Sequence, residues 1–239
     1  MKKDIKLVRS LHQKKFRNET GLFIVEGKKM VEEALNSSYE LHSLYTADAS
    51  FSSIHTQAIH INSREMAQIS MHSTAPDHLA VMRHRVVENR VVSGNVVVLD
   101  GIADPGNLGT IVRTADWFGI SRIFCTQDCV ELYNPKVVQA TMGSIFRVDV
   151  LYAEVTEIVS LLGRYKYRML GADLGGESIY SFPFGKLDAI VIGSESHGIR
   201  SEMRSAISSL ITIPKQGKAE SLNASIAASI ILSEVYRRQ

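Results

Sequence analysis

The chain has 239 residues, of which 45% are hydrophobic and 22% are charged. These proportions are ordinary for a folded globular protein, and they exclude a disordered chain and a fibrous or repeat protein. The net charge of +2 is weak, so charge indicates a partner only where it is locally concentrated. The length allows either one or two domains.

The sequence offers no sign of membrane insertion, secretion or metal binding. The longest apolar runs, such as residues 95–99 and 189–192, are far shorter than the roughly 20 residues that a membrane span needs. No apolar stretch follows the charged residues 1–5, so we predict no secretory signal and a cytoplasmic location. Cys125 and Cys129 lack the spacing and the nearby histidines of a metal site, and we expect both thiols to be buried.

A basic segment opens the chain, because Asp4 is the only acidic residue among the first 17 positions. The basic residues of this segment are Lys2, Lys3, Lys6, Arg9, Lys14, Lys15 and Arg17. Such a concentration is typical either of an arm that binds nucleic acid or of a helix face exposed to solvent.

Residues 1–90 have the pattern of a small α/β domain. Short apolar runs predict strands at residues 22–25, 41–45, 58–61 and 79–82. Helical spacing of apolar residues predicts a helix over residues 27–35. A charged, non-periodic stretch then runs from residue 83 to Gly94, and we place a domain boundary near residue 90. The predicted domains therefore cover residues 1–90 and 91–239.

After the boundary, apolar strands alternate with helical patterns. The predicted strands cover residues 96–99, 122–125, 147–151, 167–171, 189–192 and 210–213. The predicted helices cover residues 108–118, 135–142, 155–162 and 221–236. This alternation predicts an α/β fold with a parallel sheet that is covered by helices on both faces.

The first polar segment directly follows the predicted strand at residues 96–99. Pro105 and Gly106 predict a turn, and Asn107 suits the N-cap of the next helix. The helical pattern leaves Arg113 off the apolar face. A purely structural interpretation assigns Asn107 to capping and Arg113 to solvent. At the carboxyl end of a parallel strand, however, a cap side chain also lines any ligand crevice.

The second segment runs from Gly193 to Gly198, after the predicted strand at residues 189–192. Two glycines around Glu195 permit close approach of the backbone to a ligand, although an ordinary loop before a helix has the same pattern. We interpret His197 as a surface histidine rather than a base. The chain contains neither a dinucleotide-binding nor a P-loop motif, so neither of these sites is predicted.

The third segment leads from Ile213 through Gly217 to Asn223 and into the last predicted helix. This helix is apolar on nearly all sides, which predicts burial against the sheet and against a second subunit. All three segments leave the carboxyl ends of predicted parallel strands, where ligands of open α/β sheets bind. We therefore expect them to share one site.

Together the segments resemble the SpoU (TrmH-like) family of RNA methyltransferases in the SPOUT superfamily. The first resembles the family motif Asn-x-Gly-x-x-x-Arg, with Asn107, Gly109 and Arg113. The second resembles Gly-x-Glu-x-x-Gly, with Gly193, Glu195 and Gly198. The third resembles Ile-Pro…Gly…Ser-Leu-Asn-x-Ser-x-Ala, with Ile213, Pro214, Gly217, Ser221, Leu222, Asn223, Ser225 and Ala227. The departures are Lys215 and Ala224, where the family often has methionine and valine.

The resemblance implies a deep trefoil knot and a homodimer whose active sites use both subunits. It also implies S-adenosylmethionine as cofactor and 2′-O-methylation of a ribose in structured RNA. The implied cofactor-binding residues are Gly193, Gly198, Ile213, Gly217 and Leu222, and the implied catalytic residues are Asn107, Arg113, Glu195, Ser221 and Asn223. Because arginine is effectively always protonated, we expect Arg113 to stabilise the developing alkoxide or bind a phosphate rather than act as the base.

The N-terminal domain, including Phe23-Ile-Val-Glu-Gly27 after the basic segment, resembles the ribosomal-protein-like substrate-binding domain of the same family, which favours ribosomal RNA over tRNA. We expect phosphate contacts from Lys14, Lys15, Arg17 and Lys28. A tRNA methyltransferase and a non-catalytic RNA-binding or ribosome assembly factor are the alternatives, and the intact polar residues argue against the second. A base-modifying methyltransferase would need a residue that reads a base edge, and the sequence does not reveal one.

Overall fold

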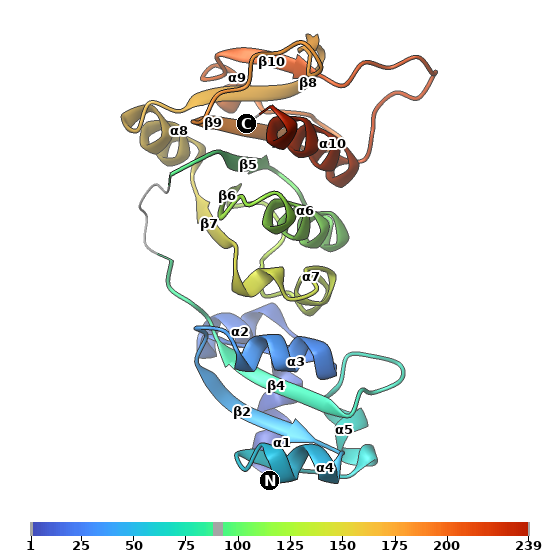
Figure 1. Ribbon diagram of the computed structural model, residues 1–239. Helices are drawn as coiled ribbons and strands as arrows, with labels where there is room; N and C mark the ends of the chain where they lie inside the picture. Colours follow the sequence, from blue (N-terminus) through green and yellow to red (C-terminus); the bar gives the residue numbers. More distant parts are fainter. Residues whose placement is uncertain (1, 88–92, 239) are drawn as a thin grey trace. The chain divides into compact units, whose positions relative to one another are not determined.

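The computed structural model describes residues 2–87 and 93–238, which form two compact units (Figure 1). The N-terminal unit comprises Met1–Val86 and Glu131–Phe146, and the C-terminal unit comprises Val87–Val130 and Arg147–Gln239. The predicted domain boundary near residue 90 lies outside the described residues.

The N-terminal unit is built on a four-stranded sheet with the order β1-β4-β2-β3. The strands are β1 (Leu22–Glu26), β2 (Leu41–Thr46), β3 (Ala58–His60) and β4 (His78–Arg83). Strand β4 is antiparallel to β1 and β2, whereas β2 and β3 are parallel. All four strands predicted for this region are present.

Seven short helical elements belong to the described residues of the N-terminal unit. They are α1 (Lys2–Ser10), α2 (Lys14–Thr20), α3 (Lys28–Leu35), α4 (Ala49–Ile54), α5 (Ser63–Ile69), α7 (Pro135–Ala140) and the 3-10 helix η1 (Ser144–Phe146). The basic segment is thus helical. The sequence pattern missed α4 and α5, although Asp48 caps α4 and Asn62 forms a capping box with Glu65.

The segment Glu131–Phe146 packs within the N-terminal unit despite its distance in sequence. The Tyr133 ring stacks on His84 at 4.0 Å between ring centroids and lies 4.5 Å from Phe23. The Tyr39 hydroxyl donates a hydrogen bond to the Ile145 carbonyl at 3.2 Å. Aromatic burial and this hydrogen bond join the segment to the sheet.

The C-terminal unit contains a six-stranded sheet with the order β10-β8-β9-β5-β6-β7, in which every neighbouring pair is parallel. The strands are β5 (Val96–Asp100), β6 (Arg122–Thr126), β7 (Asp149–Ala153), β8 (Arg168–Ser178), β9 (Asp188–Gly193) and β10 (Ser209–Thr212). The predicted parallel sheet is confirmed. The trefoil knot that the resemblance implies stays a prediction.

Helices cover both faces of this sheet (Figure 1). They are α6 (Pro105–Trp117), α8 (Val155–Arg164), α9 (Ser201–Arg204) and α10 (Ala224–Arg237). Helices α8 and α9 share an apolar core with alternate residues of β5 and β9, such as Val98 and Val191. Helices α6 and α10 lie side by side on the other face.

Helix α6 begins at Pro105 rather than after Asn107. Asp104 is the N-cap, and its carboxylate accepts a hydrogen bond from the backbone N–H of Asn107 at 2.8 Å. Proline is favourable in the first turn because its missing N–H has no partner there and its φ is already helical. The prediction that Asn107 caps this helix is therefore wrong, and its side chain is left free for other contacts.

Helix α10 is covered by this chain on one face only. Ala228 and Ile231 are buried, whereas Ile226 is 49% and Tyr236 63% exposed. The predicted burial of all sides is thus not reached within one chain. Asn223 caps the helix by accepting hydrogen bonds from the Ser225 and Ile226 amides.

Within residues 2–87 and 93–238, no helix combines the length and apolar character required to cross a bilayer. Across the same residues, no group of three or more histidine, cysteine, aspartate or glutamate side chains is arranged to bind a metal ion. Cys125 and Cys129 are free thiols, and both are buried as predicted.

Candidate functional site

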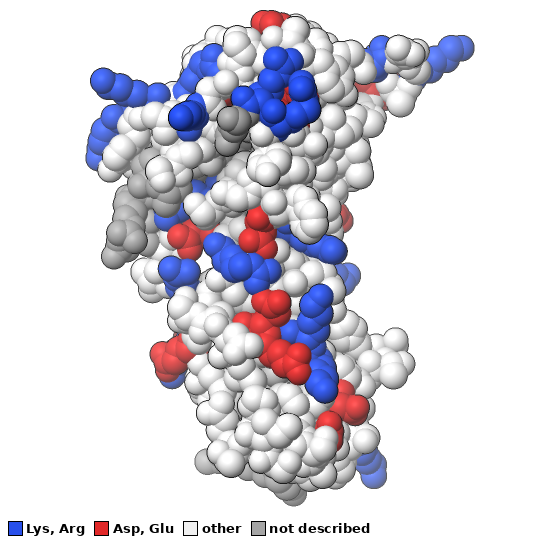
Figure 2. Space-filling model, in the orientation of Figure 1, with Lys and Arg blue, Asp and Glu red and all other residues white. Residues whose placement is uncertain are grey.

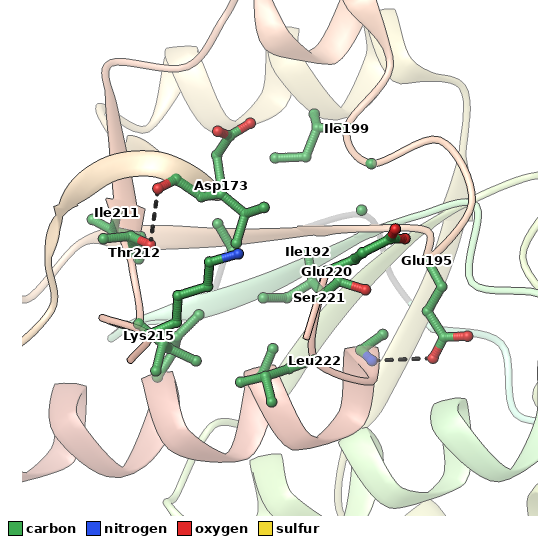
Figure 3. Close-up of a pocket in the computed structure, with 18 of the residues that line it drawn as sticks. Asp173, Ile192, Glu195, Ile199, Ile211, Thr212, Lys215, Glu220, Ser221 and Leu222 are labelled. Atoms are coloured by element: carbon green, nitrogen blue, oxygen red, sulfur yellow. Dashed lines mark hydrogen bonds between the residues drawn. The ribbon is translucent and has the colours of Figure 1, made fainter. Parts of the chain in front are cut away.

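A cavity of about 530 Å³ opens at the carboxyl ends of β9 and β10 and beside residues 172–174 in the middle of β8 (Figure 3). Its walls include the apolar side chains of Ile192, Ile211 and Leu222. The predicted site residues that line it are Gly193, Glu195, Gly198, Ile213, Gly217, Ser221 and Leu222. The second and third segments therefore meet here, as expected from their positions at strand ends.

The loop from Gly193 to Gly198 requires both of its glycines. A Cβ atom on Gly193 would lie 2.2 Å from the Gly198 carbonyl carbon, which is far inside contact distance. Gly198 has a φ of +65°, a left-handed conformation that other residues rarely adopt. The backbones of Ser194 and Gly198 pair through two hydrogen bonds of 3.1 and 2.9 Å. These constraints close the loop tightly and leave Glu195 at its tip.

Glu195 is the point at which all three polar segments meet. Its Oε1 accepts hydrogen bonds from Asn107 Nδ2 at 3.0 Å, from Asn223 Nδ2 at 2.8 Å and from the Ala224 amide at 3.2 Å. Asn223 Nδ2 also donates to Asn107 Oδ1 at 2.9 Å. The carboxylate lies at the N-terminus of α10, where the helix dipole stabilises negative charge. The network fixes the orientation of both asparagines.

Arg200, which was not predicted from the sequence, holds the chain just after this loop in place. Arg200 forms ion pairs with Asp100, which is 2% exposed at the end of β5, and with Asp128 at 2.8 Å. The Arg200 amide also donates to Asp100 Oδ2 at 2.8 Å. Burial favours a higher pKa for Asp128, but hydrogen bonds from Thr126 and Arg200 outweigh it and lower the pKa. The signal available in the sequence was an acidic residue at the end of β5, Asp100, and another two positions after β6, Asp128.

Arg113 does not line the cavity of its own chain. It is exposed on α6, as predicted, and it forms no hydrogen bond or ion pair with any described residue. It follows Asn107 by six positions, which places it about 9 Å further along the helix and about 240° around it. His197 is likewise exposed and interacts with Ser196 Oγ at 2.7 Å, as expected for a surface histidine.

The opposite wall is formed by β8 and by the long loop before α10. Asp173 accepts a hydrogen bond from Arg204 at 2.6 Å, which lowers the pKa of Asp173. In the loop, Lys215 Nζ donates to the Ala219 carbonyl at 3.2 Å. Figure 2 shows basic side-chain atoms, coloured blue, at the projecting end of this loop. Neither Asp173 nor Lys215 was predicted from the sequence as a site residue.

The expected RNA-contacting residues of the N-terminal unit divide into two groups. Lys14, Lys15 and Lys28 are exposed. Arg17 is 3% exposed, is paired with Glu131 and donates to the Leu11 carbonyl at 2.7 Å. Its placement differs from the prediction, because a buried, paired guanidinium is not available to a phosphate. On the face of this unit that Figure 2 shows, basic and acidic atoms lie next to each other.

The lining of the cavity indicates the type of ligand that it suits. Apolar side chains and glycine backbone suit the flat surface of a nucleoside. Three carboxylates, those of Asp173, Glu195 and Glu220, line the cavity and favour positive charge on a ligand. Lys215 is the single cationic side chain among the described residues that line it.

Comparisons with known protein families match both parts of the chain. Residues 94–233 match the SpoU rRNA Methylase family, and residues 2–80 match the MRM3-like substrate binding domain.

Two similar bacterial proteins have names that state an activity. The chain is 28% identical to the 23S rRNA (guanosine(2553)-2'-O)-methyltransferase RlmP of Bacillus subtilis, covering 94% of this chain and 92% of the relative. It is 30% identical to the 23S rRNA (guanosine-2'-O-)-methyltransferase RlmB of Neisseria meningitidis, covering 91% and 87%.

Two solved structures of RNA methyltransferases are also similar to this chain over nearly its whole length. A putative RNA methyltransferase of the TrmH family from Porphyromonas gingivalis is 35% identical with a TM-score of 0.91, covering 98% of this chain and 97% of that one. An AdoMet-bound rRNA methyltransferase from Sinorhizobium meliloti is 27% identical with a TM-score of 0.90, covering 98% and 94%.

Proposed function

This chain belongs to the SpoU rRNA methylase family, and on that premise we propose that it uses S-adenosylmethionine to methylate a ribose 2′-hydroxyl of ribosomal RNA. The observation that carries the proposal is the meeting of three motifs at Glu195, on the edge of a cavity of nucleoside size. A site that holds a cofactor and a ribose against the same residues would bring the methyl group and the 2′-oxygen together, and this proximity favours methyl transfer.

The cofactor would lie in the cavity between its two loops. Gly193 and Gly198 present backbone on one side, and Ile213, Gly217 and Leu222 contribute to the other. When bound, the cofactor would supply an activated methyl group for transfer to the ribose 2′-oxygen, with S-adenosylhomocysteine and the hydroxyl proton as the other products. The carboxylates of the lining favour its sulfonium charge.

We assign the ribose-orienting role to the polar residues around Glu195. Asn107 and Asn223 are fixed by Glu195 and by each other, so they would lose little side-chain freedom when RNA binds. The Ser221 hydroxyl lines the cavity and forms no hydrogen bond with the described residues, so it is available to a substrate hydroxyl.

Arg113 would stabilise the negative charge that develops on the ribose oxygen, or bind the adjacent phosphate. Arginine guanidinium groups carry a proton at neutral pH as a class, so arginine is poorly suited to act as a base. Because it lies outside the cavity of its own chain, we propose that it acts on the site of a second copy in a homodimer.

Exposed apolar side chains on α6 and α10 support this dimer. Trp117 is 83% exposed, Tyr236 63% and Ile226 49%. Large apolar residues that gather on two adjacent helices are typical of a protein–protein interface. The same face carries Arg113 on α6, so association there would bring this arginine towards the partner.

We propose ribosomal RNA as the substrate and the cytoplasm as the compartment. The N-terminal unit would bind RNA phosphates through Lys14, Lys15 and Lys28, and Arg17 is left out because it is buried. The family match of this unit to a substrate-binding domain supports an RNA-recognition role.

The activity is tested with purified protein, methyl-labelled S-adenosylmethionine, and separate ribosomal RNA and tRNA fractions. We expect label on a ribose 2′-oxygen of ribosomal RNA, mapped by resistance of the modified position to alkaline cleavage. Arg113→Ala should lower the rate by about 100-fold or more while S-adenosylhomocysteine affinity is unchanged. Label on a base, label in tRNA alone, or RNA binding without cofactor binding would each refute the proposal.

Mixing two inactive variants tests the shared site. We expect Arg113→Ala and Glu195→Ala each to inactivate the homodimer, whereas a mixed dimer would contain one site with both residues intact. We expect the mixture to recover a substantial part of the wild-type activity. If Arg113 acted within its own chain, every site in the mixed dimer would lack one residue and the mixture would stay inactive.

A further inference from the structure

The loop before α10 directs one lysine into the cavity. Lys215 follows β10 directly after Ile213 and Pro214, and its side chain reaches inward between the walls (Figure 3). Its Nζ donates one hydrogen bond, to the Ala219 carbonyl at 3.2 Å. The described residues offer it no other hydrogen bond and no ion pair. Since a lysine ammonium has three donors, two are left for a ligand.

The surrounding carboxylates do not neutralise this ammonium. Asp173 accepts hydrogen bonds from Arg204 at 2.6 Å and from the Gly175 amide at 3.0 Å. Glu195 is occupied by the two asparagines and the Ala224 amide. Glu220 lines the cavity but forms no ion pair with Lys215. Lys215 therefore brings a single unpaired positive charge into a cavity whose other charged side chains are acidic.

This arrangement complements the charges of the cofactor. S-adenosylmethionine carries two positive groups, the sulfonium and the α-ammonium, and one negative group, the α-carboxylate. Acidic side chains suit the positive groups, and the single cation suits the single anion. We propose that Lys215 binds the α-carboxylate of the cofactor and makes the cavity selective for ligands that retain it. This inference rests on the proposed function, because it takes S-adenosylmethionine as the ligand.

The second lysine of the loop provides an internal comparison. Both lysines are exposed, but Lys218 does not line the cavity, although it lies only three positions further along the chain. A general attraction of RNA phosphates to this loop would involve both lysines. Recognition of the carboxylate would involve Lys215 alone, so substitutions at the two positions distinguish these possibilities.

The test measures affinity by isothermal titration calorimetry, without turnover. One ligand is S-adenosylhomocysteine, and the other is its decarboxylated analogue, which lacks only the α-carboxylate. We expect Lys215→Met to weaken binding of S-adenosylhomocysteine by about tenfold, or about 1.4 kcal/mol, and to leave the analogue's affinity nearly unchanged. Lys218→Met is the matched control and should leave both affinities at their wild-type values.

Conservative variants separate charge from packing. Lys215→Arg should retain most of the preference for the carboxylate, whereas Lys215→Gln should lose it. Unchanged melting temperatures would show that both variants are folded. The proposal is overturned if the ratio of the two affinities is the same in Lys215→Met and in the wild type. If instead the wild type binds neither ligand, the proposed function itself fails.

Discussion

The two loops that line the cavity are secured in very different ways. The loop from Gly193 to Gly198 is closed by backbone pairing, and Arg200 fastens the residues just after it to Asp100 and Asp128. Residues 214–223, by contrast, are exposed throughout, and before the capping residue Asn223 one side-chain hydrogen bond, from Lys215 to Ala219, is found among them. One wall is therefore organised before a ligand arrives, and the other is free to adapt to it.

The largest expected difference between the loops comes from adding one methyl group to each. Gly193→Ala would place its Cβ 2.2 Å from the Gly198 carbonyl carbon, whereas a Cβ at Gly217 has no atom within 4 Å. We expect Gly193→Ala to lower the free energy of unfolding by about 3 kcal/mol or more and to abolish S-adenosylhomocysteine binding. Gly217→Ala should change stability by less than about 0.5 kcal/mol. Urea denaturation and calorimetry measure both quantities, and equal effects would contradict the contrast.

Removal of the ion pairs that Arg200 forms with Asp100 and Asp128 should have the next largest effect. Arg200→Met leaves the Asp100 carboxylate, which is 2% exposed, without its cationic partner. Breaking a fully buried pair costs about 3–5 kcal/mol, and we expect about 2–3 kcal/mol here because the Arg200 side chain is 36% exposed. Arg204→Met, which breaks a more exposed pair with Asp173, is the control and should cost less than about 1 kcal/mol. The free energies of unfolding in urea would show the order.

Asn223 joins the two loops, and its two functions can be separated. Its side-chain oxygen caps α10, while its Nδ2 donates to Glu195. Asn223→Ala should lower stability by about 1 kcal/mol through loss of the cap, and Asn223→Ser should restore most of that stability. Neither variant donates an amide hydrogen to Glu195, so we expect both to lose methyl-transfer activity. If Asn223→Ser retained full activity, the donation to Glu195 would be unimportant.

The smallest effect concerns the acid stability of β8, the strand that lies beside the exposed loop in the same wall. The hydrogen bond from Arg204 holds the pKa of Asp173 below its usual value of 3.8. A lowered pKa in the folded state stabilises the protein above about pH 4, and this contribution disappears as pH falls through the lowered pKa. Wild type should therefore lose stability below pH 4 more steeply than Asp173→Asn, while the two have a nearly constant difference at neutral pH. Thermal melts from pH 2.5 to 7 would measure it.

Most of the fold was predictable because its signals are local. The apolar runs that predicted ten strands all correspond to strands of the structure, and their alternation with helices predicted the parallel sheet. Short polar helices such as α4 and α5 escaped because a few residues carry little periodicity. The start of α6 was misjudged because both Asp104 and Asn107 suit a helix cap, and only the backbone shows which one accepts the amide hydrogen bond.

The sequence by itself determined which three segments meet, since parallel strands place their carboxyl ends at one edge of the sheet. Only the tertiary structure decided how they meet. The contact of Asn107 with Glu195 joins residues 88 positions apart, and Arg17 is buried because Glu131, 114 positions away, packs against it. Packing between distant elements likewise decides that Lys215 lines the cavity and that Arg113 does not. Residue spacing reports the period of one helix or strand, whereas a side chain's partner depends on every element around it.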